Sequence, residues 1–525
     1  MSKALTCYAR GISETIPDIH LPDLERVTLG RGPLTKIRDH KLSREQISLV
    51  ANYEDYSIRL EVVGGNPSEA RGFLLRNGEV TYLKHKESFK LLPHSYKFMC
   101  LFTPAPPESD EPGQDSAPPM KKQKLDSLMK EPTFKTLQSN DKREWIEVNK
   151  NEAQIMITPN ARDPNPKLAV YDMDGTIITT KSGNVFPKNT DDWQIIYPTV
   201  PGKLKSLVKE GYKIVIYTNQ AGVAKGKTSL TDIVTKIENI FLKRLGIPVA
   251  VLVCTSSGGF FRKPRTGLWE IFVSRYNGGL IDKSSSFYVG DAAGRDKGWK
   301  AGKKKDFSNS DRLFALNIEF QFHTPEEHFL GERPTENYTM PSFDPYNFKK
   351  PSSLLDPHDS ELEVVNTQEV IMMVGMQGSG KSFFARKYFK NYVYASNDVS
   401  GNREKTLKIL QNALSSGKSV IVDNTHPEAA TRAKYLNIIA KYDDVRARCF
   451  VMNTNPSHAR HNNLFRELIG EEHAKVNEIL FNQYTNKFEP PQLTEGFHSI
   501  VSVNFIPKFS SEEQENLYNT HLLEK

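Results

Sequence analysis

The chain has 525 residues, too many for one hydrophobic core, so its length predicts three or four domains. Its composition, 38% hydrophobic and 25% charged, is that of an ordinary soluble protein and excludes wholesale disorder. No stretch of 18 uncharged apolar residues occurs, which excludes a spanning helix, and we expect no secretory signal. The four cysteines are scattered without paired spacing, which excludes a zinc finger and a disulfide scaffold.

The net charge of +7 is unevenly distributed along the chain. Residues 141–340 carry a net +6, whereas residues 341–525 carry a net −1. A basic surface attracts polyanions. The segment 141–340 is therefore the part of the chain that composition favours for contact with a nucleic acid.

Two proline-rich stretches divide the chain. Residues 106–140 are rich in proline, serine and acidic residues and nearly free of large apolar ones, which predicts a disordered linker. A second break, with prolines every few residues, runs through roughly 332–359. We therefore expect folded domains at 1–105, 141–338 and 339–525.

The three folded segments differ in their patterns. The first holds short β-type runs punctuated by Gly, Asn and Pro and no long amphipathic helix, which predicts a β-sandwich. These runs cover residues 26–29, 47–51, 56–63, 73–75, 79–83 and 96–102. The other two segments alternate apolar strands with amphipathic helices, for example over 204–211 and 381–390. This alternation predicts two α/β domains with parallel sheets and ligands at the carboxyl ends of the strands.

The second segment contains a set of catalytic residue types at strand ends. The apolar run KLAVYDMDGT delivers Asp172 and Asp174 into a turn, where one carboxylate can attack and the other can move protons. Thr218 follows 46 residues after Asp172, Lys263 another 45 residues on, and Asp291 a further 28 residues on. A polar turn after a buried strand is the alternative interpretation, and the presence of all four elements in order disfavours it.

Nucleophile, hydroxyl, cation and distal carboxylate in this order resemble the haloacid dehalogenase-like phosphatases over about residues 160–330. The resemblance implies that Asp172 attacks phosphorus, while Asp174 protonates the leaving alcohol and then activates water. It implies that Thr218 and Lys263 hold the transferring group. It also implies Mg²⁺, bound by Asp172, the backbone carbonyl of Asp174, and Asp291.

The third segment contains a phosphate-binding loop. The run EVIMMVGMQGSGKS fits GxxxxGK[ST] through Gly375, Gly378, Gly380, Lys381 and Ser382, and it follows an apolar strand and opens a predicted helix. In such a loop the backbone amides cradle the phosphates of ATP, the lysine reaches the β and γ oxygens, and the serine binds Mg²⁺. A chance glycine loop is disfavoured because both strand and helix are in place.

Further candidates follow this loop. Asp398, 17 residues after Lys381, can serve as the base for an acceptor hydroxyl. Arg460 and Arg466 fall on a predicted helix that could close over the nucleotide. A solvated helix face is the alternative interpretation for both arginines, and the sequence leaves it open.

The order of the three segments resembles the family of animal polynucleotide kinase 3′-phosphatases. The stretches that carry the resemblance are VTLGRGPLT, SGNVFP, GYKIVIYTNQAGVAKGK, VGDAAGR, KKKDFSNSDRLFALN, VDNTHP, ARHNN and KFEPPQLTEGF. The resemblance implies a nuclear DNA-repair enzyme that removes phosphate from 3′ ends and phosphorylates 5′-hydroxyl ends of broken strands. Opposed activities on one position would cancel, whereas activities on opposite termini complement each other.

Three positions depart from the family pattern. Asn397 stands where an arginine usually precedes the catalytic aspartate, and Leu464 occupies an arginine position in the lid-like helix. Lys225 replaces an arginine after the TNQ strand. These departures bear on substrate contacts rather than on the reaction types.

The N-terminal segment resembles a forkhead-associated domain through VTLGRGPLT, KLSRE and GGNPS. The resemblance implies binding of phosphothreonine in a repair scaffold protein. The residues it implies for phosphopeptide contacts are Arg31, Lys41, Ser43, Arg44 and Asn66. The histidine usual three residues after the serine is replaced by Gln46. A sandwich that only mediates packing is the alternative.

Localisation and rival functions complete the set of expectations. PPMKKQK, residues 118–124, predicts nuclear import or, alternatively, a solvated run of charge. Phe186 is a candidate for base stacking, with a core position as the alternative. We expect a monomer with no membrane contact, and we weigh two rivals: a metabolite kinase/phosphatase pair and a phosphoprotein-binding scaffold with inactive enzyme domains.

Overall fold

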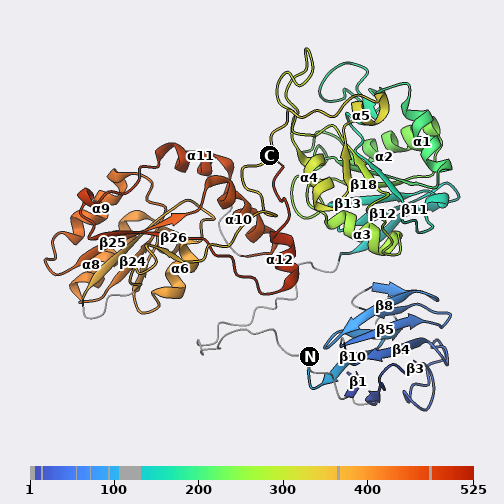
Figure 1. The fold of residues 1–525 in the computed structure, drawn as a ribbon, viewed down its shortest axis with the longest axis horizontal. Helices are drawn as coiled ribbons and strands as arrows, with labels where there is room; N and C mark the ends of the chain where they lie inside the picture. The colour runs from blue at the N-terminus through green and yellow to red at the C-terminus, as the bar shows by residue number, and fades with distance from the viewer. Residues whose placement is uncertain are drawn as a thin grey trace. The chain divides into compact units, whose positions relative to one another are not determined.

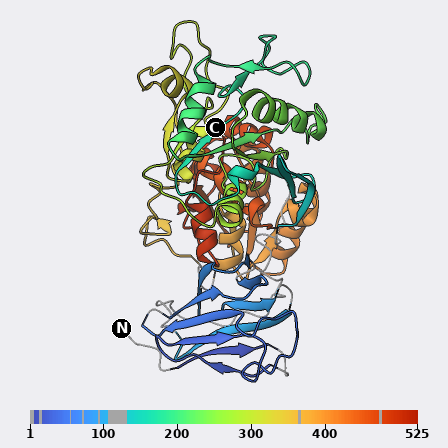
Figure 2. The same cartoon turned by 90° about the vertical axis from the view of Figure 1, so that its right-hand side faces the viewer.

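The computed structural model forms two compact units, residues Met1–Leu125 and Asp126–Lys525 (Figures 1 and 2). The structure describes residues 6–12, 16–54, 56–70, 73–92, 95–105, 132–362, 367–471 and 476–524. The predicted import segment, 118–124, lies outside the described residues. Among the residues described, no helix combines the length and apolar character needed to cross a membrane.

The first unit is a β-sandwich built from two antiparallel sheets, ordered β2-β1-β10-β9-β6-β7 and β3-β4-β5-β8 (Figure 2). Its strands are β1 (Thr6–Gly11), β2 (Ile19–His20), β3 (Arg26–Leu29), β4 (Ile47–Asn52), β5 (Ser57–Val62), β6 (Ser68–Ala70), β7 (Phe73–Leu75), β8 (Val80–Lys84), β9 (Ser88–Leu92) and β10 (Ser95–Thr103). Alternate residues of strands such as β5 point into a shared core. All six predicted runs form strands, and β1, β2, β6 and β9 are additional to them.

The second unit begins with an eight-stranded sheet, ordered β11-β12-β13-β18-β17-β14-β19-β20. The strands are β11 (Phe134–Asn140), β12 (Arg143–Val148), β13 (Ala153–Ile157), β14 (Leu168–Tyr171), β17 (Lys213–Asn219), β18 (Ala250–Cys254), β19 (Phe287–Val289) and β20 (Gln321–His323). The five strands from β18 to β20 in this order run parallel. A separate antiparallel ribbon of two strands, β15 (Ile178–Thr179) and β16 (Gln194–Ile195), lies between β14 and β17 in the sequence.

Helices cover both faces of this sheet (Figure 1). One face packs against α1 (Val200–Lys209), α2 (Leu230–Glu238), the π-helix η2 (Asn239–Leu245) and α5 (Pro325–Leu330). The other face packs against η1 (Pro159–Ala161), α3 (Gly267–Tyr276) and α4 (Ser310–Asn317). Because both faces are buried, the central strands are continuously apolar, as in the fully buried LAVY of β14. The helix expected over 204–211 is α1, which begins earlier.

The predicted linker is wrong at its C-terminal end. Residues 134–140 form β11, which pairs with β12 and adds an antiparallel edge to the eight-stranded sheet. The Asn140 side chain closes the hairpin by accepting hydrogen bonds from the amides of Lys142 and Arg143, at 2.9 and 3.1 Å. The strand is mostly exposed at the edge of the sheet. Its polar composition, which suggested disorder, therefore reflects contact with solvent. The other predicted domain boundaries stay predictions.

The rest of the second unit is a six-stranded sheet, ordered β21-β26-β25-β22-β24-β23. Its strands are β21 (Leu355–Asp356), β22 (Glu369–Val374), β23 (Val393–Ala395), β24 (Val420–Asp423), β25 (Arg446–Asn453) and β26 (Ser499–Asn504). Apart from β21, these strands pair in parallel. The sheet therefore places the residues after β22, β23 and β24 at one edge.

Helices flank this second sheet as well. One face packs against α6 (Lys381–Tyr388), and the other against α8 (Arg403–Ser415) and α9 (Ala429–Ile439). The helix predicted over 381–390 thus ends two residues early, at Tyr388. The remaining elements are α7 (Asn397–Ser400), α10 (Pro456–Leu468), α11 (Glu478–Lys487), η3 (Leu493–Glu495) and α12 (Glu512–Tyr518).

Candidate active sites

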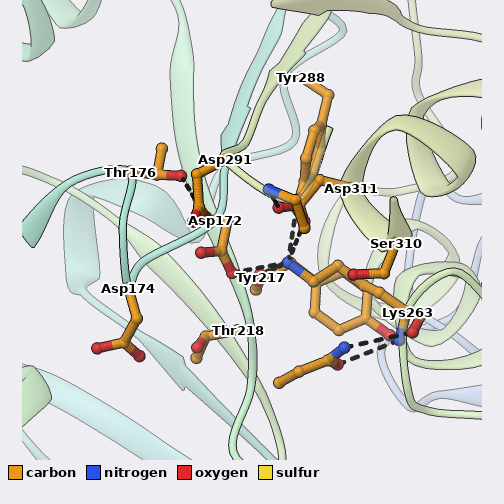
Figure 3. A network of polar contacts seen from close by, with 12 residues as sticks. Asp172, Asp174, Thr176, Tyr217, Thr218, Lys263, Tyr288, Asp291, Ser310 and Asp311 are labelled. Atoms are coloured by element: carbon orange, nitrogen blue, oxygen red, sulfur yellow. Dashed lines mark hydrogen bonds and ion pairs between the residues drawn. The ribbon is translucent and has the colours of Figure 1, made fainter. Parts of the chain in front are cut away.

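The first candidate site lies at the carboxyl ends of the central strands of the larger sheet (Figure 3). Asp172 directly follows β14, Thr218 is the penultimate residue of β17, and Asp291 follows β19 by two residues. Lys263 comes from the loop between β18 and α3. In the sheet, β14 lies between β17 and β19, so connections leave it toward both sides. Open α/β sheets bind ligands at the carboxyl ends of the strands at such a point.

Lys263 is the electrostatic centre of this site. Its side chain is 1% exposed, and Nζ donates to Asp172 Oδ1 at 2.8 Å and to Asp311 Oδ1 at 2.7 Å. Nζ also contacts the Tyr288 hydroxyl at 2.7 Å and the Tyr217 carbonyl oxygen at 2.6 Å. Burial opposes the charged form, but the Asp172 and Asp311 carboxylates raise the pKa of Lys263 above its usual range. The ammonium group therefore stays charged.

Three carboxylates form a cluster here, of which Asp172 and Asp311 are buried and Asp291 is partly buried. Asp172, Asp291 and Asp311 each place one oxygen within 4.8 Å of the others (Figure 3). Burial, and then the charge of Asp172, raise the pKa of Asp291 well above its usual range. Burial and the Asp311 charge likewise raise the pKa of Asp172, although Lys263 opposes this. One lysine does not balance three carboxylates, so the donor set fits a divalent cation of the Mg²⁺ type.

Asp311 was missed by sequence reasoning. It lies in the first turn of α4, and it accepts hydrogen bonds from Lys263, from the Tyr288 hydroxyl and from the Ala292 amide. An acidic residue in a first helical turn has an ordinary explanation in the helix dipole, so its position alone did not mark it. Only the fold brings it to the other two carboxylates.

Asp174 lies apart from the carboxylate cluster, in the more open part of the site (Figure 3). Its side chain is 45% exposed, and Oδ1 pairs with the Lys236 ammonium group at 2.6 Å. Gln220 Nε2 donates to Asp174 Oδ2 at 2.6 Å and to Thr218 Oγ1 at 2.8 Å. Gln220 thus links the two predicted residues, and the Asp174 carboxylate is accessible for proton transfer.

Gly175 shapes the turn that carries both aspartates. Its φ of +85° lies in the left-handed region, and a Cβ atom there would be 2.3 Å from Asp291 Oδ2. Any side chain would therefore strain the backbone and displace the Asp291 carboxylate. The close approach of this turn to Asp291 requires glycine.

Phe186 lies at the surface and not in the core, which removes the core alternative. The ring is 72% exposed, and the Lys227 ammonium group lies 5.9 Å from its centroid. Lys225, one of the departures from the family pattern, is exposed on the segment that follows β17. These groups offer an aromatic face and positive charge at the surface of the part of the chain that contains the eight-stranded sheet.

The second candidate site is the loop between β22 and α6, where Lys381 is the first helical residue. Gly378 has φ +75°, and a Cβ atom there would be 2.2 Å from the Ala459 carbonyl oxygen, so α10 packs directly on the loop. Among the residues described, Gln377 Oε1 and Ser379 Oγ in this loop are buried without a hydrogen-bond partner. Orphaned polar atoms in a glycine loop fit a cradle for a phosphate-bearing ligand.

Lys381 is buried, and its ammonium group contacts the protein backbone. Its Nζ donates to the Met376 carbonyl oxygen at 2.7 Å. Burial and, to a smaller extent, the Arg466 charge lower the pKa of Lys381 to about 8, although the Asp423 and Asp398 charges oppose the shift. The charges of Arg466, Asp423 and Asp398 thus act on the Lys381 ammonium group. The site therefore combines a partly desolvated cation with two carboxylates.

Asp423 and Ser382 meet through Tyr394. The Tyr394 hydroxyl donates to Asp423, and the Ser382 side chain acts on the same hydroxyl by lowering the pKa of Tyr394, against the larger raising effects of burial and Asp423. Asp423 ends β24, beside the loop. Serine and aspartate at these positions fit a Mg²⁺ ion that accompanies a nucleotide.

The structure separates the two arginines that the sequence had paired. Arg466 is largely buried on α10 near Lys381, and its Nε has no partner among the residues described. Arg460, on the same helix, pairs instead with Glu478 of α11 at 2.9 Å and donates to Asn482 at 3.0 Å. A nucleotide contact from Arg460 is therefore not supported by this geometry, because α11 already supplies its acceptors.

Two family departures have local structural roles here. The Asn397 side chain accepts a hydrogen bond from the Thr406 hydroxyl at 2.8 Å, which ties α7 to α8. Leu464 packs against the apolar cluster of Phe465, Leu468, Tyr518 and Leu522. At both positions the side chain contacts the protein itself.

In the first unit, the loop between β3 and β4 meets the loop between β5 and β6. The Arg31 amide donates to the Ser43 carbonyl oxygen at 2.8 Å, and the Asn66 side chain donates to the Lys41 carbonyl oxygen. Gln46, which replaces the family histidine, is buried and donates to the Asn66 carbonyl oxygen. One connected cluster of loops thus contains the residues predicted to contact a phosphopeptide, which are Arg31, Lys41, Ser43, Arg44 and Asn66. The buried Gln46 side chain helps to hold these loops together.

Comparison with known proteins identifies the three parts of the chain. A family model described as polynucleotide kinase 3 phosphatase matches residues 167–329, an FHA domain model matches 7–77, and an AAA domain model matches 370–491. A bifunctional polynucleotide phosphatase/kinase from Schizosaccharomyces pombe is 35% identical over 344 residues, 65% of this chain and 80% of the relative. The chain belongs to this family of bifunctional polynucleotide phosphatase/kinases.

Other relatives of this family member match a smaller part of it. A polynucleotide 3′-phosphatase from Saccharomyces cerevisiae is 30% identical over 214 residues, 31% of this chain and 86% of the relative. One from Arabidopsis thaliana is 38% identical over 177 residues, 31% of this chain and 24% of the relative. The resemblance, the fold class and the combination of a phosphatase with a kinase are confirmed. The roles of individual site residues stay predictions.

Proposed function

We propose that this chain restores the termini of broken DNA strands in the nucleus, by removing 3′-phosphates and by phosphorylating 5′-hydroxyls with ATP. The observation that carries the proposal is the pair of complete centres in one chain. One presents a buried carboxylate held by a lysine, and the other a glycine loop with a lysine and nearby carboxylates. Family membership supports polynucleotide ends as the substrate.

In the phosphatase centre, Asp172 is the nucleophile that attacks the 3′-phosphate and takes over the phosphoryl group. Lys263 aligns the attacking carboxylate, and Thr218 hydrogen-bonds the transferring group. Asp174 gives its proton to the leaving 3′-oxygen and later accepts one from the attacking water. A Mg²⁺ ion held by Asp172, Asp291 and the Asp174 carbonyl would neutralise phosphate charge; Asp311 lies beside it.

In the kinase centre, Asp398 accepts the proton of the 5′-hydroxyl as that oxygen attacks the γ-phosphate. The loop amides of Gly375, Gly378 and Gly380 hold the phosphates of ATP, and Lys381 leaves the Met376 carbonyl to contact them. Ser382 supplies a hydroxyl ligand for the accompanying Mg²⁺. We assign the nucleotide contact to Arg466 and not to Arg460, because the Arg466 charge acts on Lys381 whereas Arg460 pairs with Glu478.

The two rivals are less well supported. An inactive scaffold would not need a cluster of three carboxylates, two of them buried, beside one lysine, which is costly without a function. A metabolite enzyme would not need an exposed Phe186 with Lys227 against it, whereas an aromatic face and a cation suit stacked bases and phosphates. Polynucleotide ends therefore fit better than a small metabolite.

A gapped duplex tests the proposal directly. The substrate carries a labelled 3′-phosphate on one side of the gap and a labelled 5′-hydroxyl on the other, with ATP and Mg²⁺ present. We expect the purified chain to convert both ends, and unlabelled oligonucleotide to compete. Conversion of only one end, or competition by sugar phosphates but not by oligonucleotide, would contradict the proposal.

The forkhead-associated domain is proposed to recruit the enzyme to a threonine-phosphorylated repair protein. Arg31 stands in the loop cluster, where its guanidinium can form paired, charge-assisted hydrogen bonds with a phosphate. Arg31→Ala should weaken binding of a phosphothreonine peptide about 10- to 100-fold and leave both end-processing activities unchanged. Calorimetric titration measures this, with the unphosphorylated peptide as control. Equal affinity for both peptides would refute phosphothreonine recognition.

A further inference from the structure

The segment that follows α12, residues 520–524, contacts the loop that carries Lys263. The Glu524 carboxylate forms a two-pronged ion pair with Arg262, in which Nη2 lies 3.0 Å from Oε2. The Leu522 carbonyl oxygen accepts a hydrogen bond from Arg265 Nη1 at 2.8 Å. The contacts therefore fall on both sides of Lys263, one residue before it and two residues after it.

The same segment contacts the helix that carries Asp311. Asn317, the last residue of α4, donates through Nδ2 to the Pro264 and His521 carbonyl oxygens, both at 2.8 Å. At the other end of this helix, the Asn309 amide donates to the Glu524 carbonyl oxygen at 3.3 Å. Residues 520–524 thus connect the lysine loop with α4, and these two elements supply Lys263 and its partner Asp311.

The residues that make these contacts are buried or charged, so the loss of the contacts would disturb the loop that carries Lys263. Arg265 is almost wholly buried, and the Gly259 and Leu522 carbonyl oxygens are its hydrogen-bond acceptors. Leu522 is fully buried in a cluster with Phe465 and Tyr518, against which Phe260 of the phosphatase loop packs. Without residues 520–524, Arg262 would lose its carboxylate partner and the buried Arg265 would keep only the Gly259 carbonyl oxygen as an acceptor among the described residues, which is unfavourable. The lysine loop would have to rearrange.

We propose that residues 520–524 position Lys263 and Asp311, so that turnover at the phosphatase centre depends on a segment that follows the kinase sheet in the chain. The proposal rests on the role proposed for Lys263. Glu524 acts here as a positioning residue, since it touches neither the carboxylate cluster nor Lys263 itself. It holds Arg262, and through Arg262 the backbone of the catalytic loop.

Glu524→Gln in the full chain tests this dependence. We expect kcat for 3′-dephosphorylation to fall about tenfold at unchanged KM, because a small displacement of a catalytic group is costly. The 5′-kinase should keep its kcat and KM. Glu515→Gln is the matched control: Glu515 lies on α12, pairs with Lys350 at 3.1 Å, and is exposed. Glu524→Asp, which keeps the charge, should recover part of the lost kcat.

Truncation after Asn519 is the stronger variant and should reduce phosphatase turnover further than Glu524→Gln. Unchanged phosphatase kcat in both variants would overturn the proposal. A parallel fall of both activities with a lowered melting temperature would also overturn it, because it would indicate a general loss of folded protein. Lys263→Met in the same assay separates the two levels of inference: if that variant stays active, the proposed role of Lys263 fails instead.

Discussion

The two centres of this molecule hold their lysines in opposite ways. Lys263 contacts two carboxylates, a hydroxyl and a carbonyl, and its pKa is raised. Lys381 donates to one backbone carbonyl, and burial lowers its pKa to about 8. The first lysine is fully engaged before substrate arrives, whereas the second must exchange a weak partner for its ligand.

The difference follows from where the negative charge of each reaction originates. In the proposed mechanism the nucleophile of the phosphatase centre is a protein carboxylate, so the protein itself supplies the anions there. The proposed kinase centre receives its anion with the nucleotide, and within the described part of the chain Arg466 Nε is buried there without a hydrogen-bond partner. Preorganised charge of either kind reduces the reorganisation that the reaction requires.

The largest expected effect separates the two centres completely. Asp172→Asn should reduce 3′-dephosphorylation by about four to six orders of magnitude, because an amide cannot form the acyl-phosphate. The 5′-kinase of the same variant should be unchanged. Release of phosphate from a 3′-phosphorylated oligonucleotide measures the first activity, and transfer from labelled ATP measures the second. A variant that still dephosphorylates at near wild-type rate would refute Asp172 as nucleophile.

The next largest effect concerns the kinase alone. Asp398→Asn should lower kcat for 5′-phosphorylation by about 10²–10⁴-fold, the usual contribution of a general base, and spare ATP binding. Lys381→Ala, in contrast, should lose ATP affinity. Turnover and ATP affinity are measured separately for both variants. If Asp398→Asn loses ATP binding instead of turnover, Asp398 is not the base.

The smallest effect is a pH dependence that should occur at one lysine and not at the other. Below pH 8 Lys381 is protonated and attracts phosphate; as pH rises through 8 the free protein loses that proton, so ATP affinity should fall. The fall should be at most about tenfold per pH unit. Calorimetric titration of Asp398→Asn with ATP from pH 7 to 9.5 measures it. Adding Lys381→Ala should abolish the slope, and a persisting slope would assign it to another group.

Much of both sites could be predicted because parallel strands end at a common edge. Asp172, Thr218 and Asp291 each follow or close an apolar strand, so their convergence needed only the sheet topology. The glycine loop was equally predictable, since its spacing is local and its strand and helix are contiguous. These features depend on short-range pattern and on one general rule of fold geometry.

What could not be predicted depends on contacts between distant segments. Asp311 meets Asp172 across 139 positions of sequence, and nothing local distinguishes it from a helix-capping carboxylate. Arg460 found its acceptors on α11, 18 residues away, so a helix face alone did not say where its side chain turns. The strand β11 was hidden because an exposed edge strand has the composition of a linker.

Gly175 has a consequence for the interpretation of natural sequence variants. A substitution there would leave every ionisable group of the phosphatase centre present, yet it would push aside the Asp291 carboxylate, 116 residues away in the sequence. An inventory of catalytic side chains would pass such an allele as intact. We expect individuals carrying it to retain 5′-phosphorylation and to accumulate breaks with blocked 3′ ends. The two phenotypes would separate because only the hydrogen atom of a glycine fits beside Asp291 at this position.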